Sequence, residues 1–103
     1  MWSVVVIYNH PTDPAAFEKY YAGTHLPLVT KHAKEIGFTR SVFMKFPSNL
    51  DGSTPAFYRK AELWFDSEAD MTRGTATPGF AAVAGDLPNF ASGGVVALVG
   101  QQT

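Results

Sequence analysis

The chain has 103 residues, of which 46% are hydrophobic and 14% aromatic, and its formal net charge is −1. A chain of this length is expected to form one domain over residues 1–103. Because no run of basic residues occurs, we expect neither nucleic acid nor a membrane surface as a partner. The lack of cysteine excludes disulfide bonds, thiolate metal sites and cysteine catalysis, and it fits a cytoplasmic protein.

Four segments are expected to be strands. Residues 2–8 are β-branched and aromatic, and their apolar run is too short for a signal peptide or a membrane span. Residues 38–46 and 56–65 alternate and lie close in sequence, so they are expected to pair as a hairpin. The closing strand is expected over 93–100.

The helices are expected in two pairs. In the first pair, Asp13 is expected to cap the start of one helix and Gly23 to mark its end. Pro27 is expected to bend the chain near residues 24–26, and a second helix would then run from Pro27 to about Ile36.

A second pair of short helices is expected after the hairpin. Asp66 or Ser67 would cap the first of them, which ends near Gly74. Thr77 would cap the second, with Pro78 as its first residue. The resulting order reduces to βαββαβ with each helix split. This order predicts an α+β, ferredoxin-like fold, in which a four-stranded antiparallel sheet carries its helices on one face.

One stretch carries a family resemblance. Residues 4–31 read VVVIYNHPTDPAAFEKYYAGTHLPLVTK. The strand ending in Tyr8, the tyrosine pair at 20–21, and the THLPLV segment resemble the opening of the EthD family, within the dimeric α+β barrel superfamily. The family takes its name from a gene cluster for the degradation of ethyl tert-butyl ether. The resemblance implies a homodimer that packs sheet to sheet, with a cleft between sheet and helices in each protomer.

The wider superfamily includes isomerases, cyclases, polyketide-tailoring oxygenases and haem enzymes, so the fold by itself does not fix the chemistry.

His25 is the candidate catalytic residue. It directly precedes Leu26-Pro27, where the expected bend would aim its ring into the cleft. Histidine exchanges protons near neutral pH and can act as a general acid or base. In the alternative interpretation, the ring caps the carbonyls of the first helix or bonds across the turn, and takes no part in chemistry.

Aromatic side chains are the candidate substrate-binding residues. Tyr8 ends the first strand, and Tyr21 lies four residues before His25, on the same helix face. Their phenols would orient a carbonyl or phenolic ligand; alternatively, at least one of them fills the core. The complete set of candidates is Tyr8, Tyr20, Tyr21, Trp64 and Phe80.

The alternation of residues 56–65 divides their side chains between two faces. Trp64 shares a face with Tyr58, Lys60 and Glu62, which favours an interface or a wet cleft over a dry core. The other face is expected to pack under the helices. Its core residues are Phe57, Leu63 and Phe65.

No pattern indicates a metal or a cofactor. His25 and His32 are seven residues apart, but Pro27 separates them, and no carboxylate cluster accompanies a histidine in the sequence. Phosphate-binding loops and nucleophile motifs do not occur either. We therefore expect neither a metal nor a cofactor.

Two functions from different classes follow. The first is a small homodimer that binds an apolar or aromatic compound and acts on it as a cofactor-independent acid/base enzyme of the isomerase, cyclase, decarboxylase or oxygenase type. The second is a non-catalytic ligand carrier or accessory protein for an oxidoreductase. Either would fit a pathway that degrades or tailors small organic compounds. The lack of a second ionisable residue beside His25 in the sequence favours the second function.

Overall fold

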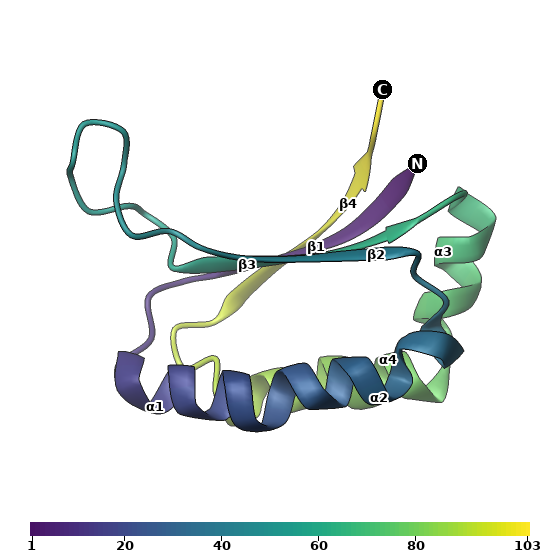
Figure 1. Ribbon diagram of the computed structural model, residues 1–103, viewed down its shortest axis with the longest axis horizontal. Helices are drawn as coiled ribbons and strands as arrows, with labels where there is room; N and C mark the ends of the chain where they lie inside the picture. The colour runs from purple at the N-terminus through teal and green to yellow at the C-terminus, as the bar shows by residue number, and fades with distance from the viewer.

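The computed structural model describes residues 1–103. Its centre is a four-stranded antiparallel sheet with the strand order β2-β3-β1-β4. The sheet carries its helices on one face only (Figure 1), so the predicted ferredoxin-like fold is confirmed. The strands are β1 (Trp2–Tyr8), β2 (Arg40–Lys45), β3 (Arg59–Phe65) and β4 (Val95–Gln101).

The helices form a layer under the sheet, and α3 stands at one end of it (Figure 1). None of them is both long and apolar enough to cross a membrane. They are α1 (Pro14–Tyr20), η1 (Tyr21–His25), α2 (Leu26–Ile36), α3 (Glu68–Thr75), α4 (Pro78–Asp86) and η2 (Leu87–Asn89).

Side-chain caps set the start of three helices as the sequence predicts. Asp13, Ser67 and Thr77 each accept a hydrogen bond from the backbone N–H three residues later. Each cap satisfies one of the N–H groups that a helix leaves unpaired at its first turn. At the far end of α2, Gly37 takes the left-handed conformation with φ 84°, which ends the helix before β2.

The prediction that the chain bends before Pro27 is wrong. The chain stays helical through this region, and η1 is one turn of π-helix between α1 and α2. The N–H of Leu26 reaches back five residues to the carbonyl of Tyr21. Proline lacks an N–H and crowds the carbonyl four residues before it. A wider turn relieves this crowding without breaking the helix.

The π turn also keeps one helix face pointing at the sheet. Phe17, Tyr21, His25 and Val29 are spaced by four residues, and all four are buried. In a regular α-helix each such step overshoots a full turn by about 40°. The wider turn between Tyr21 and His25 holds more residues and cancels part of this drift. As a result, His25 faces the sheet rather than solvent.

The buried side chains form two clusters under the sheet. One packs α2, α3 and α4 against β3, and contains Ile36 and Phe65 at its centre. The other lies at the α1 end and is mostly aromatic. Its members are Tyr8, Phe17, Tyr21, Tyr58 and Phe90.

Two predictions fail just before β3, because the regular strand begins only at Arg59. Tyr58 does not share the face of Trp64; it is buried against Phe17, with ring centroids 5.0 Å apart. Phe57 is 41% exposed instead of lying in the core. Leu63 and Phe65, within the strand, are buried as predicted.

The register divides the sheet into two faces. Val6 pairs with Ala61 and Ala97, and this row faces the helices. Val5 pairs with Glu62 and Leu98, and this neighbouring row faces away from them. No helix covers this second face (Figure 1), which we call the open face.

Candidate functional site

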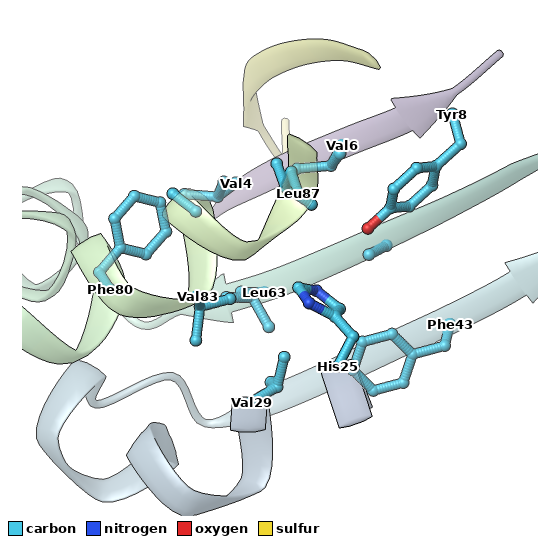
Figure 2. Close-up of a pocket in the computed structure, with 12 residues that line it drawn as sticks. Val4, Val6, Tyr8, His25, Val29, Phe43, Leu63, Phe80, Val83 and Leu87 are labelled. Atoms are coloured by element: carbon cyan, nitrogen blue, oxygen red, sulfur yellow. The ribbon is translucent and has the colours of Figure 1, made fainter. Parts of the chain in front are cut away.

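A small apolar cavity lies between the sheet and the helices. Its volume is about 50 Å³. Figure 2 shows its walls: β1 and β3 on one side, α2 and α4 on the other, and Phe43 of β2. Eleven of its twelve lining residues are hydrophobic. They are Val4, Val6, Tyr8, Val29, Phe43, Ala61, Leu63, Phe80, Val83, Ala84 and Leu87, and His25 is the twelfth.

His25 lies at the end of the π turn and is only 4% exposed. Its side chain does not cap either neighbouring helix. Instead, its Nδ1 lies 2.8 Å from Oδ2 of Asp86, the last residue of α4. The interpretation of His25 as a capping residue is therefore wrong. Sixty-one positions separate the two residues in sequence, and the packing of the helices brings them together.

Asp86 is held from its other side as well. Its Oδ1 accepts hydrogen bonds from the Tyr20 hydroxyl at 2.6 Å and the Asn89 amide at 3.0 Å. Burial alone raises the pKa of Asp86. The hydrogen bonds from Tyr20, Asn89 and His25 outweigh this effect and bring the pKa of the carboxyl below its usual value. Asp86 is therefore a carboxylate at neutral pH.

The carboxylate fixes the tautomer of a neutral His25. An ionised carboxylate can only accept hydrogen bonds, so Nδ1 of His25 must carry the proton that lies between them. Nε2 is then left with a free lone pair and no partner in the chain. A histidine oriented in this way can take a proton at Nε2, and the carboxylate stabilises the imidazolium that forms.

Tyr8 enters the cavity from β1. Figure 2 shows its hydroxyl pointing into the space where the ring of His25 lies. The side chain is 1% exposed, and the hydroxyl has no hydrogen-bond partner in the chain. Burial is the main cause that raises the pKa of Tyr8 far above its usual value. The hydroxyl therefore stays protonated and can donate a hydrogen bond.

Phe80 lines the cavity, but Tyr21 does not. As the spacing predicts, Tyr21 lies beside His25, and the two rings stack with centroids 5.8 Å apart. The guanidinium of Arg59 also lies over the Tyr21 ring, 4.8 Å from its centroid. Burial raises the pKa of Tyr21 to about 12. Its buried hydroxyl has no partner, so the side chain supports His25 by packing.

Trp64 lies away from the cavity, on the open face. It pairs with Ser3 and Arg40, and the Arg40 guanidinium lies 5.0 Å from its ring centroid. Its indole N–H donates to Glu62 at 3.2 Å. Trp64 therefore cannot touch a ligand that occupies the cavity beside His25.

Asp86 is the residue that the sequence interpretation missed. The sequence shows no acidic residue close to His25, but the folded chain places the carboxylate of Asp86 against its ring. The prediction that the histidine lacks an ionisable neighbour is therefore wrong. One signal was present: an aspartate at the carboxyl end of a helix is electrostatically unfavourable, because the negative end of the helix dipole lies there. Such local conflicts often mark functional sites.

The structure contains no cluster of potential metal ligands. No group of three or more His, Cys, Asp or Glu side chains is placed to hold an ion. His32 lies 3.5 Å from Glu35 on the outer part of α2, apart from His25. His10 contacts the carbonyl of Pro55 at 2.7 Å.

The fold and the buried site define the class of the protein. It is a ferredoxin-like α+β protein with an apolar cavity between its sheet and its helices. The model of the EthD domain matches residues 9–94, and the chain belongs to the EthD family.

Similar proteins agree with this assignment. The chain is 40% identical over 98 residues to an uncharacterized 11.0 kDa protein of the thcB-thcC intergenic region of Rhodococcus erythropolis, covering 95% of this chain and 91% of the relative. An EthD family protein from Bacillus halodurans has the same fold, with a TM-score of 0.87 at 23% identity over 100% of this chain and 99% of the other.

A third similar structure is a dimeric ferredoxin-like protein of unknown function from Jannaschia sp. CCS1. It matches with a TM-score of 0.72 at 11% identity, over 99% of this chain and 100% of that one. At this identity the likeness shows the fold alone.

Proposed function

We propose that the chain binds a small apolar molecule in the cavity and acts on it by proton transfer through His25. The observation that carries this proposal is the His25–Asp86 contact of 2.8 Å at the edge of an otherwise apolar cavity. Here a carboxylate takes one nitrogen and the other is free to meet a ligand.

The size and lining of the cavity limit the ligand. Its volume of about 50 Å³ is well below that of the apolar cavity of roughly 150 Å³ known to admit benzene. A ligand with one ring therefore requires Phe43 or Phe80 to move. Phe43 is 36% exposed on the edge strand β2, so its ring has room to turn outward.

The protein would act as a homodimer that packs through its open faces. Val96, Leu98 and Met44 expose apolar side chains there. An apolar sheet face without a covering helix is expected to be buried against a partner. The dimeric state of the Jannaschia protein of similar fold supports this proposal. The dimer would place Trp64 at the interface.

The alternative is a carrier or accessory protein of an oxidoreductase, which would bind the same ligands without changing them. The buried Asp86 favours the enzyme, because a carrier needs no carboxylate behind its histidine. In either case we propose that the protein works in the cytoplasm, in a pathway that degrades or tailors small organic compounds. We also propose that residues 1–103 form one domain.

Cyclopentanone is a suitable binding probe, because it is neutral, compact and mostly apolar. We expect its addition to shift the ¹H–¹⁵N amide signals of Val29, Val83 and Ala84, which line the cavity. The amide signals of Val5 and Leu98 on the open face serve as internal controls and are expected to stay unchanged. Shifts that are uniform over both faces, or absent, contradict the proposed binding site.

A filled cavity is the matched control. In the Ala84→Leu variant a larger side chain projects into the same space, so we expect the shifts at Val29 and Val83 to disappear. The variant's own melting temperature shows whether the fold has survived. If the folded variant still gives the wild-type shifts, the probe binds elsewhere.

A further inference from the structure

Two polar groups meet the apolar cavity from opposite walls. The hydroxyl of Tyr8 comes from the sheet, and the imidazole of His25 comes from the helices (Figure 2). The hydroxyl is a donor without a partner, whereas Nε2 of the neutral imidazole is an acceptor without a partner. Because both residues line the cavity, both atoms are open to whatever occupies it. This opposed pair therefore points to a ligand that accepts a hydrogen bond at one atom and gives up a proton at another.

The charges around the cavity restrict the ligand further. No lysine or arginine lines it. Arg59, which contacts Tyr21, donates to Glu18 at 2.6 Å and 3.0 Å, and Lys45 lies 3.6 Å from the same carboxylate. A ligand carboxylate would therefore be buried without a counter-charge, which is strongly unfavourable. The lining therefore favours a neutral ligand over a carboxylate.

We propose that the site takes a neutral carbonyl compound and transfers a proton at the carbon next to the carbonyl, with His25 as the base and Tyr8 as the hydrogen-bond donor to the oxygen. This inference rests on the proposed function, since it needs a cavity that admits the ligand and a His25 that can accept a proton. It adds the class of substrate, the reacting atoms and the role of Tyr8.

The step balances within the ligand and the two side chains. The α C–H bond breaks, its proton goes to Nε2 of His25, and its electron pair becomes the enolate, whose oxygen accepts the hydrogen bond from Tyr8. The imidazolium then returns the proton to the α carbon or, in an unsaturated ketone, to the γ carbon. Neither an oxidant nor a co-reactant takes part. Asp86, as a positioning residue, stabilises the imidazolium between the two transfers.

Cyclopent-3-en-1-one tests the reaction. Its conversion to cyclopent-2-en-1-one needs only this proton transfer, and the conjugated product is followed by its ultraviolet absorbance. We expect wild-type protein to accelerate the conversion above the rate in buffer. Tyr8→Phe should lower kcat by roughly 100-fold or more, because it removes the only donor to the oxygen. His25→Gln should lower it by about 10²–10⁴-fold.

Tyr58→Phe is the matched control. It removes a buried tyrosine hydroxyl that also lacks a partner, but Tyr58 does not line the cavity. We expect its kcat to equal that of the wild type. If Tyr58→Phe and Tyr8→Phe lower kcat equally, the loss reflects a general change in packing and the role of Tyr8 is wrong.

Binding and reaction can fail separately. If cyclopentanone shifts the cavity signals but wild-type protein does not accelerate the isomerisation, the carbonyl chemistry is overturned while the binding site stands. If cyclopentanone leaves the cavity signals unchanged, the proposed function fails with it. An acceleration that survives in His25→Gln would also overturn the inference, since another group would then be the base.

Discussion

The two faces of the sheet carry different chemistry, although the same strands supply both. Towards the helices, β1 presents Val4, Val6 and Tyr8 to a cavity that His25 also lines, and Asp86 pairs with His25 from outside the lining. On the open face, charged groups pair along and between the strands, and apolar side chains stay exposed. Lys60 forms an ion pair with Glu62, and the Arg40 guanidinium lies over the ring of Trp64.

The difference shows how one sheet can present two surfaces of different chemistry. Because side chains alternate along a strand, one face can enclose a ligand while the other remains free for a partner. A shift of the register by one residue would exchange the two faces. The comparison therefore predicts that substitutions on the helix side affect folding and ligand binding, and that those on the open face affect self-association.

The largest effect is expected from Phe65→Ala. Phe65 has no exposed surface and lies in the core cluster of α2, α3 and α4. Its truncation should lower the free energy of unfolding by about 3–5 kcal/mol. Leu98→Ala is the matched change on the open face, where the side chain is 48% exposed. We expect it to change protomer stability by less than about 1 kcal/mol. Urea unfolding of both variants measures the difference, and equal losses would break the comparison.

A smaller loss is expected from Gly74→Ala in α3. The added Cβ would lie 2.2 Å from the carbonyl oxygen of Ile36 and 2.8 Å from the ring of Phe65. The overpacking should lower the free energy of unfolding by about 1–3 kcal/mol. Gly85→Ala in α4 is the control, since no atom lies within 4 Å of its Cβ. The control should gain about 0.5–1 kcal/mol from helix propensity. If Gly85→Ala destabilises as much as Gly74→Ala, the close packing of α3 is not the cause.

The dependence of stability on acid pH should reveal how strongly folding favours the ionised form of Asp86. Its hydrogen bonds hold the pKa of the folded carboxyl below the usual value of 3.8, so the folded state favours the ionised form. The resulting stabilisation is fully present above pH 3.8, and is lost as the pH falls through the lower pKa of the folded protein. The Asp86→Asn variant, which cannot ionise, should show a flatter decline of stability below pH 3.8 than the wild type does. Parallel curves would mean that the carboxyl is not stabilised by folding.

The smallest effects are expected from the adjacent tyrosines. Tyr20→Phe removes the hydrogen bond to Asp86 and should lower the melting temperature. Tyr21→Phe removes a buried hydroxyl without a partner, and should leave stability unchanged or raise it by roughly 1 kcal/mol. Thermal unfolding of the two variants under identical conditions compares them. A loss at Tyr21 that matches the loss at Tyr20 would show that the Tyr21 hydroxyl is bonded after all.

Self-association should respond only to the open face. Leu98→Asp places a charge among exposed apolar side chains, and we expect it to shift the protein from dimer to monomer in sedimentation without loss of secondary structure. Ala84→Leu, on the helix side, should remain dimeric. A wild-type protein that sediments as a monomer at micromolar concentration would contradict the proposed dimer.

Local rules were sufficient to predict the fold. Caps at Asp13, Ser67 and Thr77 and the pairing of the hairpin follow from short-range chemistry, and the structure confirms them. The π turn was missed because a proline inside a helical segment normally signals a break. The four-residue spacing of the buried side chains from Phe17 to Val29 was the available sign that the helix continues.

The site was predicted only in part, because its key contact is long-range. His25, Tyr8 and Phe80 do line the cavity. Asp86 meets His25 because α4 packs beside α2, and no spacing in the sequence encodes that meeting. Trp64 was placed with the ligand because its aromatic ring suits a pocket, but the alternation of β3 directs it to the other face.

The ring nitrogens of His25 give the most direct test of the account, because every proposal for the cavity depends on them. In ¹⁵N-labelled protein at neutral pH, long-range ¹H–¹⁵N spectra should show the Nδ1–H tautomer, with Nε2 unprotonated and shifting as cyclopentanone is added. In Asp86→Asn this tautomer preference should be lost. A wild-type His25 that carries its proton on Nε2 and does not respond to cyclopentanone would contradict the claim that Asp86 directs a reactive nitrogen into the cavity.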